Sequence, residues 1–576
     1  MVDPLSSLSS ASSATRVAPR GPAVTPREDV AEDTSIRAAW LTCGALVAIA
    51  ALFHLYLLHT VFAHIDSDQA VVGLMAYHIQ AGDRPVFYDG QPYQGSLEAY
   101  LAALVFSVLG ANEWTIRLPA LAFSIAFVGA VYWLGITLYG RWIAVLAGLF
   151  VALGPALLSN WSTAVGFSYI EVMVCGTLLL LLAVRYPDPR AMPLAVALAW
   201  GVLAGIGMWI QPMMGEYLVP LAVAFALRLL AGPRDRSLSG WLASGRSLAT
   251  ILVGAGIGSA PLLVYNMRHG WATLSFLHPQ ASGGDHLAVA GRLITQSAPV
   301  LLGLVTPTTV GSVFARLIAT HPVSYGAGVL VGAGILVRLV FDLRGLPLRI
   351  VALAYPPCRR RRIPLNSVII RGHHDERGPC DGALALFAVS CLLFFVFTHF
   401  GAMPWATRSP RYLLPLYTIT PLVLDVFIPR HPGRLDRWTA ALAVSVLIAA
   451  GLTTTLTTEP RPAVDGLTRL LETRHIRVAY TTYWLANRIA FATHEQVLGV
   501  PVADDLTLGQ ERLPSYLALA AHTPTPYIAW IFAVGGPGER HFRQLMQHAH
   551  IRAHRTPWEN LIVYDTLSKP LRVRPL

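Results

Sequence analysis

Acidic side chains follow the first long apolar run of the chain. Asp66 and Asp68 lie in the sequence AHIDSDQAVVGLMAYHIQ, directly after a run that ends near Ala63. Aspartate is favoured at the first positions of a helix, so helix capping is one interpretation of both residues. A carboxylate held at a membrane surface can instead accept a proton from a hydroxyl group. Asp68 is therefore a candidate general base, and Asp66 is a second candidate catalytic residue.

Two amphipathic patterns follow these aspartates. Apolar residues recur every three or four positions from Gln69 to Gln80 and again from Leu97 to Leu109, which predicts two helices at a membrane surface. Glu98 opens the second helix and is the third candidate catalytic residue. Its alternative interpretation is an ordinary side chain on the polar face of that helix, and the sequence does not decide between the two.

Polar residues also mark the predicted outer ends of later apolar runs. A single ionisable group at such a position is most often an anchor that reaches toward water. Here, however, carboxylates and arginines face one compartment, and a guanidinium group matches the oxygens of a phosphate. The candidate substrate-binding residues are Glu171, Gln211, Glu216, Tyr265, Asn266, Arg268, Arg408, Arg411 and Tyr412.

The composition indicates a membrane protein. The chain has 576 residues, of which 54 % are hydrophobic and 13 % charged, and its mean hydropathy is +0.53. A typical soluble protein has about 25 % charged residues, so a soluble enzyme, a disordered protein and a coiled coil are excluded. The net charge of +11 lies mostly between apolar runs, which argues against a nucleic-acid partner. Lys569 is the single lysine among 43 basic residues, which indicates a GC-rich bacterial genome.

The apolar runs predict an all-α polytopic membrane protein with about eleven crossings. A helix needs about 20 residues to cross ~30 Å of hydrocarbon. The run from Leu97 to Leu109 is too short for this and is assigned to the membrane surface. The predicted crossings are residues 38–63, 117–139, 142–158, 169–184, 193–210, 213–231, 248–266, 323–343, 383–400, 411–428 and 439–457.

The distribution of arginines predicts the orientation of the crossings. With a cytoplasmic N-terminus, the arginine-rich connections lie inside, as the positive-inside rule requires. Residues 63–117 and 267–322 then form two outer loops. We expect residues 1–36 to be a disordered cytoplasmic tail, because the Ser-, Ala- and Pro-rich composition cannot form a core, and no signal-peptide cleavage site follows the first run.

The chain is predicted to end in a small domain of different composition. Residues 37–458 form the transmembrane catalytic domain in this interpretation, and residues 459–576 return to a soluble composition. Short β-branched or aromatic runs at 477–480, 527–534 and 561–564 alternate there with helical patterns at 465–473 and 538–550. This pattern predicts a small α/β domain, and an odd number of crossings places it on the extracytoplasmic side.

Two other patterns do not predict a site. Cys358, His373, His374 and Cys380 lack the close spacing of structural zinc ligands and lie in an arginine-rich inner loop. The glycines at 254, 256 and 258 lie inside an apolar helix instead of following a strand, so they predict close helix packing and no dinucleotide site. The five cysteines are too scattered for a disulfide framework.

The motifs around these candidate residues resemble the GT-C superfamily of glycosyltransferases, which includes protein O-mannosyltransferases and the aminoarabinose transferases of lipid A. Asp68-Gln69-Ala70 takes the place of the family's "DE-A", Gly90 to Tyr93 that of its "G-x-x-Y" turn, and Ser96 to Gly110 that of the following amphipathic helix. Arg117-Leu118-Pro119 matches "RLP", and Arg411 to Pro415 resembles a late "RYLLP" motif. The resemblance covers about residues 38–430.

The resemblance implies a sugar transferase whose donor is a polyprenyl-phosphate sugar. It would move the sugar with inversion to a hydroxyl group of a glycan, lipid or protein acceptor, at the outer face of the cytoplasmic membrane. Asp68 would be the base, and Arg411, with Arg408 or Arg268, would hold the lipid phosphate. Gln69 replaces the family's second acid, so no metal or other cofactor is implied, although a divalent cation stays an alternative.

Two alternatives stay open at this point. A transporter or flippase of a lipid-linked or anionic solute would have internal repeats and broken helices in matching halves, and the sequence contains no such repeat. A polysaccharide polymerase or ligase that uses a diphosphate-linked glycan would share most of the same chemistry.

Overall fold

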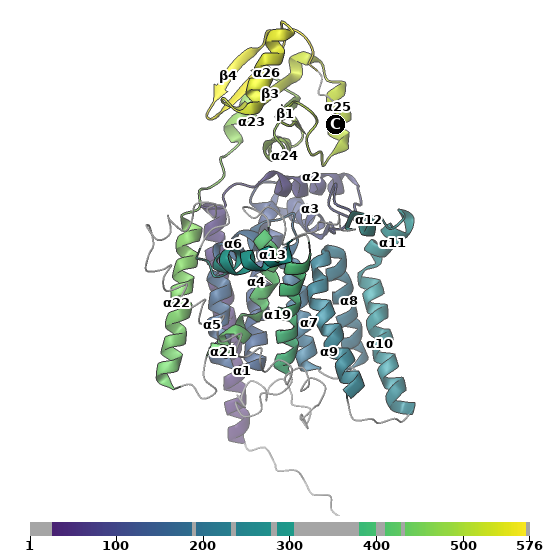
Figure 1. The fold of residues 1–576 in the computed structure, drawn as a ribbon, viewed down its shortest axis with the longest axis vertical. Coiled ribbons are helices and arrows are strands. Elements are labelled where there is room, and N and C mark those ends of the chain that lie inside the picture. The colour runs from purple at the N-terminus through teal and green to yellow at the C-terminus, as the bar shows by residue number, and fades with distance from the viewer. Residues whose placement is uncertain are drawn as a thin grey trace, which may run out of the picture.

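The protein consists of a helical bundle with a small sheet domain at one end (Figure 1). The computed structural model describes residues 26–186, 192–231, 238–277, 285–304, 380–398, 409–427 and 433–571. Cys380, the last of the four Cys and His residues considered as zinc ligands, begins a helix. The other three, Cys358, His373 and His374, lie outside the described residues, as does the candidate Arg408. So does the predicted crossing at 323–343.

Long apolar helices form the bundle. Three helical segments of the described chain are long and apolar enough to cross a membrane alone: Ile36–His59, Thr115–Leu138 and Arg434–Leu456. Two further pairs qualify only as bent spans, α5 with α6 at an angle of 69° and α10 with α11 at 67°. The bundle helices are α1 (Pro26–His59), α4 (Leu118–Leu138), α5 (Arg141–Leu153), α6 (Ala156–Thr163), α7 (Tyr169–Arg185), α8 (Leu194–Ile210), α9 (Gly215–Ala231), α10 (Leu238–Gly258), α11 (Ala260–Arg268), α19 (Cys380–Phe397), α21 (Thr420–Phe427) and α22 (Arg434–Leu456).

Proline explains why several predicted runs are not single straight helices. Pro155 separates α5 from α6, and Pro261 follows the bend between α10 and α11. The run at 411–428 begins as the 3-10 helix η6 (Ser409–Ile419), which contains Pro415. A proline inside a helix removes one N–H donor and clashes with the preceding turn, so helices bend or end there. The count of eleven crossings stays a prediction, while the helical class of this region is confirmed.

Helix α1 begins earlier than the sequence predicted. It starts at Pro26, so residues 26–36, assigned to a disordered tail from their composition, are helical. Extending an existing helix costs little, because only the first turn requires nucleation, and proline is well suited to a first helical position. The rest of the predicted tail, residues 1–25, lies outside the described residues.

The two predicted amphipathic helices lie between the bundle and the C-terminal sheet (Figure 1). They are α2 (Ser67–Ala81) and α3 (Leu97–Leu109), with the bounds that the periodicity predicted to within two residues. Helix α2 packs against both α3 and α24 (Tyr483–Ala492), and nearly all of its first ten residues are buried. Its apolar face therefore packs on protein, whereas the sequence predicts a helix at a membrane surface.

Shorter segments connect these helices. The turn after α3 leads into the 3-10 helix η1, and α11 is followed by a second short helix at the same end of the bundle (Figure 1). The short elements are η1 (Thr115–Arg117), η3 (Pro212–Met214), α12 (Ala272–Leu277), α13 (His286–Arg292), the π-helical η4 (Leu293–Ser297) and α14 (Ala298–Leu301).

The C-terminal region forms a mixed five-stranded sheet of order β2-β1-β3-β5-β4. Strand β1 pairs in parallel with β2 and β3, and β5 pairs antiparallel with β3 and β4; Tyr480 lies opposite Trp530, and Ile531 opposite Val563. Alternate residues face two small cores, one against α26 and the other against α23 and α24. The elements are α23 (Asp465–Thr473), β1 (Val478–Thr481), β2 (Leu498–Pro501), α25 (Pro514–Ala521), η7 (Thr525–Tyr527), β3 (Ile528–Ala533), α26 (Pro537–His548), β4 (His554–Trp558) and β5 (Leu561–Asp565).

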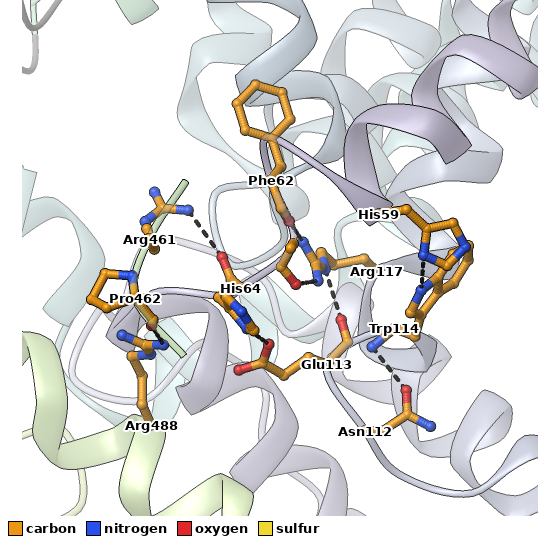
Figure 2. Close-up of polar contacts among 11 residues, drawn as sticks. His59, Phe62, His64, Asn112, Glu113, Trp114, Arg117, Arg461, Pro462 and Arg488 are labelled. Carbon is orange, nitrogen blue, oxygen red and sulfur yellow. Dashed lines mark hydrogen bonds and ion pairs between the residues drawn. The ribbon is translucent and has the colours of Figure 1, made fainter. Parts of the chain in front are cut away.

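A buried arginine closes the first predicted outer loop at its base. Figure 2 shows Arg117 reaching from the end of that loop to the main chain at its start. Its Nη1 donates to the carbonyl of Phe62, its Nη2 to that of Ala63 at 2.7 Å, and its Nε to that of Glu113 at 2.7 Å. The side chain is 2 % exposed. The arginine of the "RLP" motif therefore fixes the two ends of the loop together.

The same cluster attaches the linker to the C-terminal sheet (Figure 2). Arg461 donates to the carbonyl of His64 at 3.4 Å, and Arg488 of α24 donates to the carbonyl of Pro462 at 2.6 Å. His64 in turn contacts Glu113 at 2.8 Å. The loop base, the linker and α24 are thus joined at one place, close to the start of α2.

We predict that Arg117→Ala destabilises the protein by about 2–4 kcal/mol. The substitution leaves three main-chain carbonyls without their donor, and each buried unsatisfied group costs about 1–3 kcal/mol before water compensates in part. The measurement is the thermal unfolding temperature of the detergent-solubilised protein. Arg434→Ala is the control, because Arg434 is exposed in the first turn of α22. An unfolding temperature of Arg117→Ala equal to that of Arg434→Ala would contradict this role.

Candidate active site

The two aspartates after α1 have different roles in the structure. Asp66 is the N-cap of α2, where its Oδ1 accepts from the Gln69 N–H at 2.9 Å, and its Oδ2 pairs with Arg461 at 3.0 Å. Both oxygens of Asp66 are thus occupied by the fold. Asp68 lies in the first turn of α2 and does not cap it. Helix capping therefore accounts for Asp66 and leaves the carboxylate of Asp68 available.

One oxygen of Asp68 is held by residues from the C-terminal region. The Tyr483 hydroxyl donates to Oδ1, and Nη2 of Arg512 lies 3.7 Å from the same oxygen. The main-chain carbonyl of Asp68 accepts from the Tyr88 hydroxyl at 2.9 Å. No described residue donates a hydrogen bond to Oδ2, and 15 % of the side chain is exposed. The carboxylate is thus oriented, with one oxygen free to meet a substrate.

The surroundings of Asp68 raise its pKa. Burial is the largest cause, and the nearby charge of Asp66 acts in the same direction. The Tyr483 hydrogen bond and the charges of Arg512 and Arg411 oppose this shift by favouring the ionised form. A carboxylate whose pKa is raised is a stronger base once it is ionised, which suits general-base chemistry.

Arg411 lies in a cage of aromatic rings. Its guanidinium carbon is 5.3 Å from the ring centre of Trp161, 6.0 Å from Phe167, 5.9 Å from Tyr169 and 5.1 Å from Tyr412. The Nη2 of Arg411 donates a hydrogen bond to the Tyr412 hydroxyl at 3.2 Å. The Nε is buried and has no acceptor, and no carboxylate pairs with the guanidinium within the described chain.

Such a cage stabilises a cation without neutralising it. The negative faces of aromatic rings attract a guanidinium group, and the attraction is strongest where water is excluded. Because the described residues leave the N–H donors of Arg411 largely unused, these donors are available to an anionic ligand. Guanidinium groups bind phosphate oxygens in this way.

Asp68 and Arg411 share one electrostatic neighbourhood. Arg411 is close enough to lower the pKa of Asp68. Tyr93, the last residue of the predicted G-x-x-Y turn, interacts with both. Its pKa is raised to about 12, mainly by burial; Tyr412 and Asp68 act in the same direction as burial, and Arg411 opposes them. A free carboxylate oxygen and a caged cation therefore lie at the same end of the bundle.

The segment around Gly166 connects the two groups. Gly166 has a φ of 86°, and a Cβ there would lie 3.0 Å from the main-chain oxygen of Asp68. Only glycine suits both conditions. The segment continues into Phe167 and Tyr169, two rings of the cage around Arg411. It therefore sets the spacing between the base and the cation.

Glu98 holds this segment in place. It is 3 % exposed, and its Oε2 accepts from the Gly166 N–H at 2.7 Å and from the Ser168 hydroxyl at 3.3 Å. Burial raises the pKa of Glu98, and its neighbour within the protein is the carboxyl group of Glu171. The sequence predicts Glu98 as a catalytic residue and Glu171 as a substrate-binding one. The contacts of Glu98 are instead those of a residue that positions the connecting segment.

The other candidate residues are distributed over several places. Gln211 donates to the carbonyl of Phe167 at 3.3 Å and so supports the cage. Tyr265 stacks on His269 with ring centres 4.0 Å apart. Asn266 bonds Thr273 and fixes the turn between α11 and α12. Arg268 is exposed at the end of α11 and has no ion pair in the described part of the chain.

Glu216 lies inside the bundle, apart from these residues. It is 3 % exposed in α9, near Cys391 of α19, and the neighbouring Tyr217 bonds Thr418 at 2.8 Å. The Tyr412 hydroxyl accepts from Arg411, whereas Asn266 is occupied by internal hydrogen bonds. Among the described residues, no group of three or more His, Cys, Asp or Glu side chains is arranged to hold a metal ion.

Tyr483, Arg512 and Trp161 were missed by the sequence analysis. Tyr483 and Arg512 are more than 400 residues from Asp68 along the chain, and no motif connects them. Trp161 lies in an apolar run where it resembles any other buried aromatic residue. A weak signal existed for Tyr93, because it ends the turn that resembles the family pattern.

The fold of the chain is similar to that of solved GT-C glycosyltransferases, and part of its sequence matches a family model of this kind. Residues 94–255 match the family model described as dolichyl-phosphate-mannose-protein mannosyltransferase. The structure of ArnT from Cupriavidus metallidurans bound to undecaprenyl phosphate aligns with a TM-score of 0.57 at 13 % identity, covering 91 % of this chain and 97 % of that one. The apo structure of the same protein aligns with a TM-score of 0.52 at 13 % identity, covering 92 % and 98 %. No curated protein sequence matches the chain.

The resemblance to the GT-C superfamily is therefore confirmed, and the chain is a multi-pass membrane protein. The matched family region contains Glu98, Arg117, Glu171 and Gln211. It contains neither Asp68 nor Arg411, so the roles of these two residues rest on the geometry described above.

We predict that Glu98→Gln retains the stability of the protein and that Glu98→Ala does not. The glutamine amide oxygen can still accept from the Gly166 N–H, whereas alanine leaves that buried donor unpaired, at about 1–3 kcal/mol. Thermal unfolding of both variants in the same detergent measures the difference. Equal losses in the two variants would show that the hydrogen bond to Gly166 is not what Glu98 contributes.

Proposed function

We propose that the protein transfers a sugar from a polyprenyl-phosphate donor to an acceptor hydroxyl group, with inversion at the sugar carbon. The observation that carries this proposal is that an oriented carboxylate and a caged guanidinium, whose donors are largely unused by the described residues, lie near each other at one end of a GT-C-like bundle. The two groups form no ion pair with each other, so each can interact with a reacting group.

Asp68 acts as the general base. The acceptor hydroxyl gives its proton to Oδ2 of Asp68 while its oxygen attacks the anomeric carbon of the sugar. The bond from that carbon to the phosphate oxygen breaks, and the lipid phosphate leaves with the electron pair. A phosphate leaving group needs little protonation, so one base suffices, in contrast to the two carboxyl groups of a glycosidase.

Arg411 binds the phosphate and stabilises its growing charge. A positioned donor near developing charge commonly contributes about 3–4 kcal/mol to the transition state. The aromatic cage fixes the guanidinium before the substrate arrives, so no rearrangement is needed at the moment of reaction. Arg268 and Arg408 stay candidates for a second contact with the phosphate or its lipid.

The position of the site fits a lipid-linked donor. The ArnT structure that shares this fold contains undecaprenyl phosphate. In our proposal the lipid chain lies between the apolar bundle helices, and the transfer takes place on the outer face of a bacterial cytoplasmic membrane. The N-terminus is then cytoplasmic, about eleven helices cross the membrane, and residues 459–576 form an extracytoplasmic domain within the cell envelope.

The transporter alternative has one feature in its favour, since α5 with α6 and α10 with α11 are bent pairs. Transporter sites, however, lie near the middle of the membrane between repeats. Asp68 lies in the first turn of α2, and α2 lies between the bundle and the sheet domain (Figure 1). This position supports a reaction with a water-soluble or extended acceptor.

We predict that Asp68→Asn lowers sugar transfer by roughly 10²- to 10⁴-fold, the usual contribution of a general base. The assay follows release of polyprenyl phosphate from a panel of polyprenyl-phosphate sugars and, separately, polyprenyl-diphosphate sugars. Asp66→Asn is the matched control, because asparagine also caps helices well. Near-normal turnover by Asp68→Asn, or an equal loss in both variants, would contradict the assignment of Asp68.

We predict that Arg411→Ala weakens binding of undecaprenyl phosphate roughly ten- to hundredfold, since hydrogen bonds to charged groups contribute about 1.5–3 kcal/mol. Arg411→Lys should be intermediate, because it keeps the charge but loses the planar fork. Binding can be measured by native mass spectrometry of the purified protein, with Arg268→Ala beside it. Unchanged affinity of Arg411→Ala would remove Arg411 from the phosphate site.

A further inference from the structure

Helix α24 of the C-terminal region contacts two consecutive residues at the start of α2. The Tyr483 hydroxyl donates to Oδ1 of Asp68, and the Tyr483 carbonyl accepts from the Ser67 hydroxyl at 2.5 Å. Asn487, one turn further along α24, donates to the Ser67 oxygen at 3.0 Å. The position of the candidate base is therefore determined from outside the bundle.

Arg512 determines the direction of the Tyr483 hydrogen bond. Its Nε donates to the Tyr483 oxygen at 3.2 Å, and an arginine N–H can only donate. The Tyr483 oxygen therefore accepts from Arg512, and its own proton is directed to Asp68. Arg512 is itself fixed, since its Nη1 donates to the Gly90 carbonyl at 3.4 Å and its guanidinium lies over the Tyr88 ring at 5.5 Å.

Gly90 permits this close approach. It has a φ of 74°, and a Cβ at this position would lie 3.2 Å from the side chain of Arg512. The turn from Gly90 to Tyr93 thus contacts Arg512 at its first residue, and its last residue, Tyr93, interacts with Asp68 and Arg411. Arg512, Tyr483 and Asp68 form a chain of contacts that ends at one carboxylate oxygen.

The docking of α24 on α2 does not depend on this chain alone. The Phe491 ring occupies the space next to Gly73, where a Cβ would lie 2.3 Å from the ring, and it stacks on Tyr77 with ring centres 5.5 Å apart. Tyr77 also contacts His494 at 2.9 Å, and His78 pairs with Glu495 at 2.8 Å. These contacts hold the two helices together through apolar packing and a separate polar rim.

We propose that the C-terminal domain completes the active site: Tyr483 and Arg512 are positioning residues that bind Oδ1 of Asp68, so that Oδ2 faces the acceptor hydroxyl. This inference rests on the function proposed above. A domain that served only to receive the acceptor would need no contact with the base. The Tyr483 hydrogen bond and the ion pair with Arg512, both at the same oxygen, instead fix the carboxylate in one orientation and stabilise its ionised form.

The proposal has a pH signature that simple docking lacks. The Tyr483 hydrogen bond lowers the pKa of Asp68, against the effect of burial. Removing the hydroxyl therefore raises that pKa, and the ionised base becomes scarcer at acidic pH. The acidic limb of kcat/KM reports the ionisation of the free enzyme, so it should move to higher pH.

The experiment compares Tyr483→Phe with Tyr77→Phe in the full-length protein. Each substitution removes one hydroxyl from the interface of α2 with α24, but only Tyr483 touches Asp68. The profile of kcat/KM against pH is recorded with a polyprenyl-phosphate sugar, together with binding of undecaprenyl phosphate. We expect Tyr483→Phe to move the acidic limb upward, to lose most activity at low pH, and to bind the lipid phosphate unchanged. Tyr77→Phe should follow the wild-type profile.

Arg512→Gln provides a second variant. It removes the charge that also lowers the pKa of Asp68, so its acidic limb should move in the same direction. Wild-type profiles for both Tyr483→Phe and Arg512→Gln, or equal shifts in Tyr483→Phe and Tyr77→Phe, would overturn the positioning role. These outcomes differ from failure of the proposed function, in which Asp68→Asn itself keeps its turnover.

Discussion

Two opposite charges in this protein are held near each other without forming an ion pair. Asp68 and Arg411 interact electrostatically, yet each is stabilised by its own set of neighbours. A direct pair in this partly buried place would be the simpler arrangement, and it would leave no room for a substrate. The Tyr483 hydroxyl and Arg512 hold one carboxylate oxygen, and aromatic faces hold the guanidinium. The remaining oxygen and the unused N–H donors are what a reaction requires.

The rest of the fold maintains this separation. Gly166 lies against the main chain of Asp68 and begins the segment that carries Phe167 into the cage. Glu98 holds the same segment through the Gly166 N–H, and Gln211 holds it through the Phe167 carbonyl. Because these hydrogen bonds are largely buried, they are stronger than they would be in water and restrict the segment to one position.

A second set of contacts fixes the loop on which Asp68 lies. Arg117 joins the two ends of the loop, and Arg461 and Arg488 connect the loop base and the linker to α24 (Figure 2). In this arrangement, guanidinium groups saturate main-chain carbonyls where an irregular segment enters the apolar bundle. A buried carbonyl without a donor would be costly at such a place. The three arginines thus have a structural role, whereas most N–H donors of Arg411 have no acceptor among the described residues.

Local sequence patterns predicted much of the fold. The three- and four-residue spacing of apolar positions located α2 and α3 to within two residues, and the β-branched runs located β1, β3 and β5. Strands β2 and β4 were missed, since their sequences LGVP and HRTPW contain glycine, proline and charged residues that weaken a strand signal. The bends between α5 and α6 and between α10 and α11 were not predicted, because a bend depends on packing between helices as well as on proline.

The candidate site could be predicted only in part. Asp68 and Arg411 lie in short motifs at the ends of apolar runs, so residue type and position sufficed to select them. Tyr483 and Arg512 could not be selected, because their importance comes from the docking of α24 on α2, between segments more than 400 residues apart. Asn266 and Glu216 had the right residue types, but their neighbours within the fold occupy or bury them.

The most direct test of the central claim is an experimental structure of the protein with a polyprenyl phosphate bound. The account predicts density for the phosphate against the guanidinium group of Arg411, inside the rim of the aromatic cage, with Oδ2 of Asp68 facing the space beside it. A phosphate bound at another part of the bundle, with Arg411 and Asp68 joined in a direct ion pair, would contradict the account.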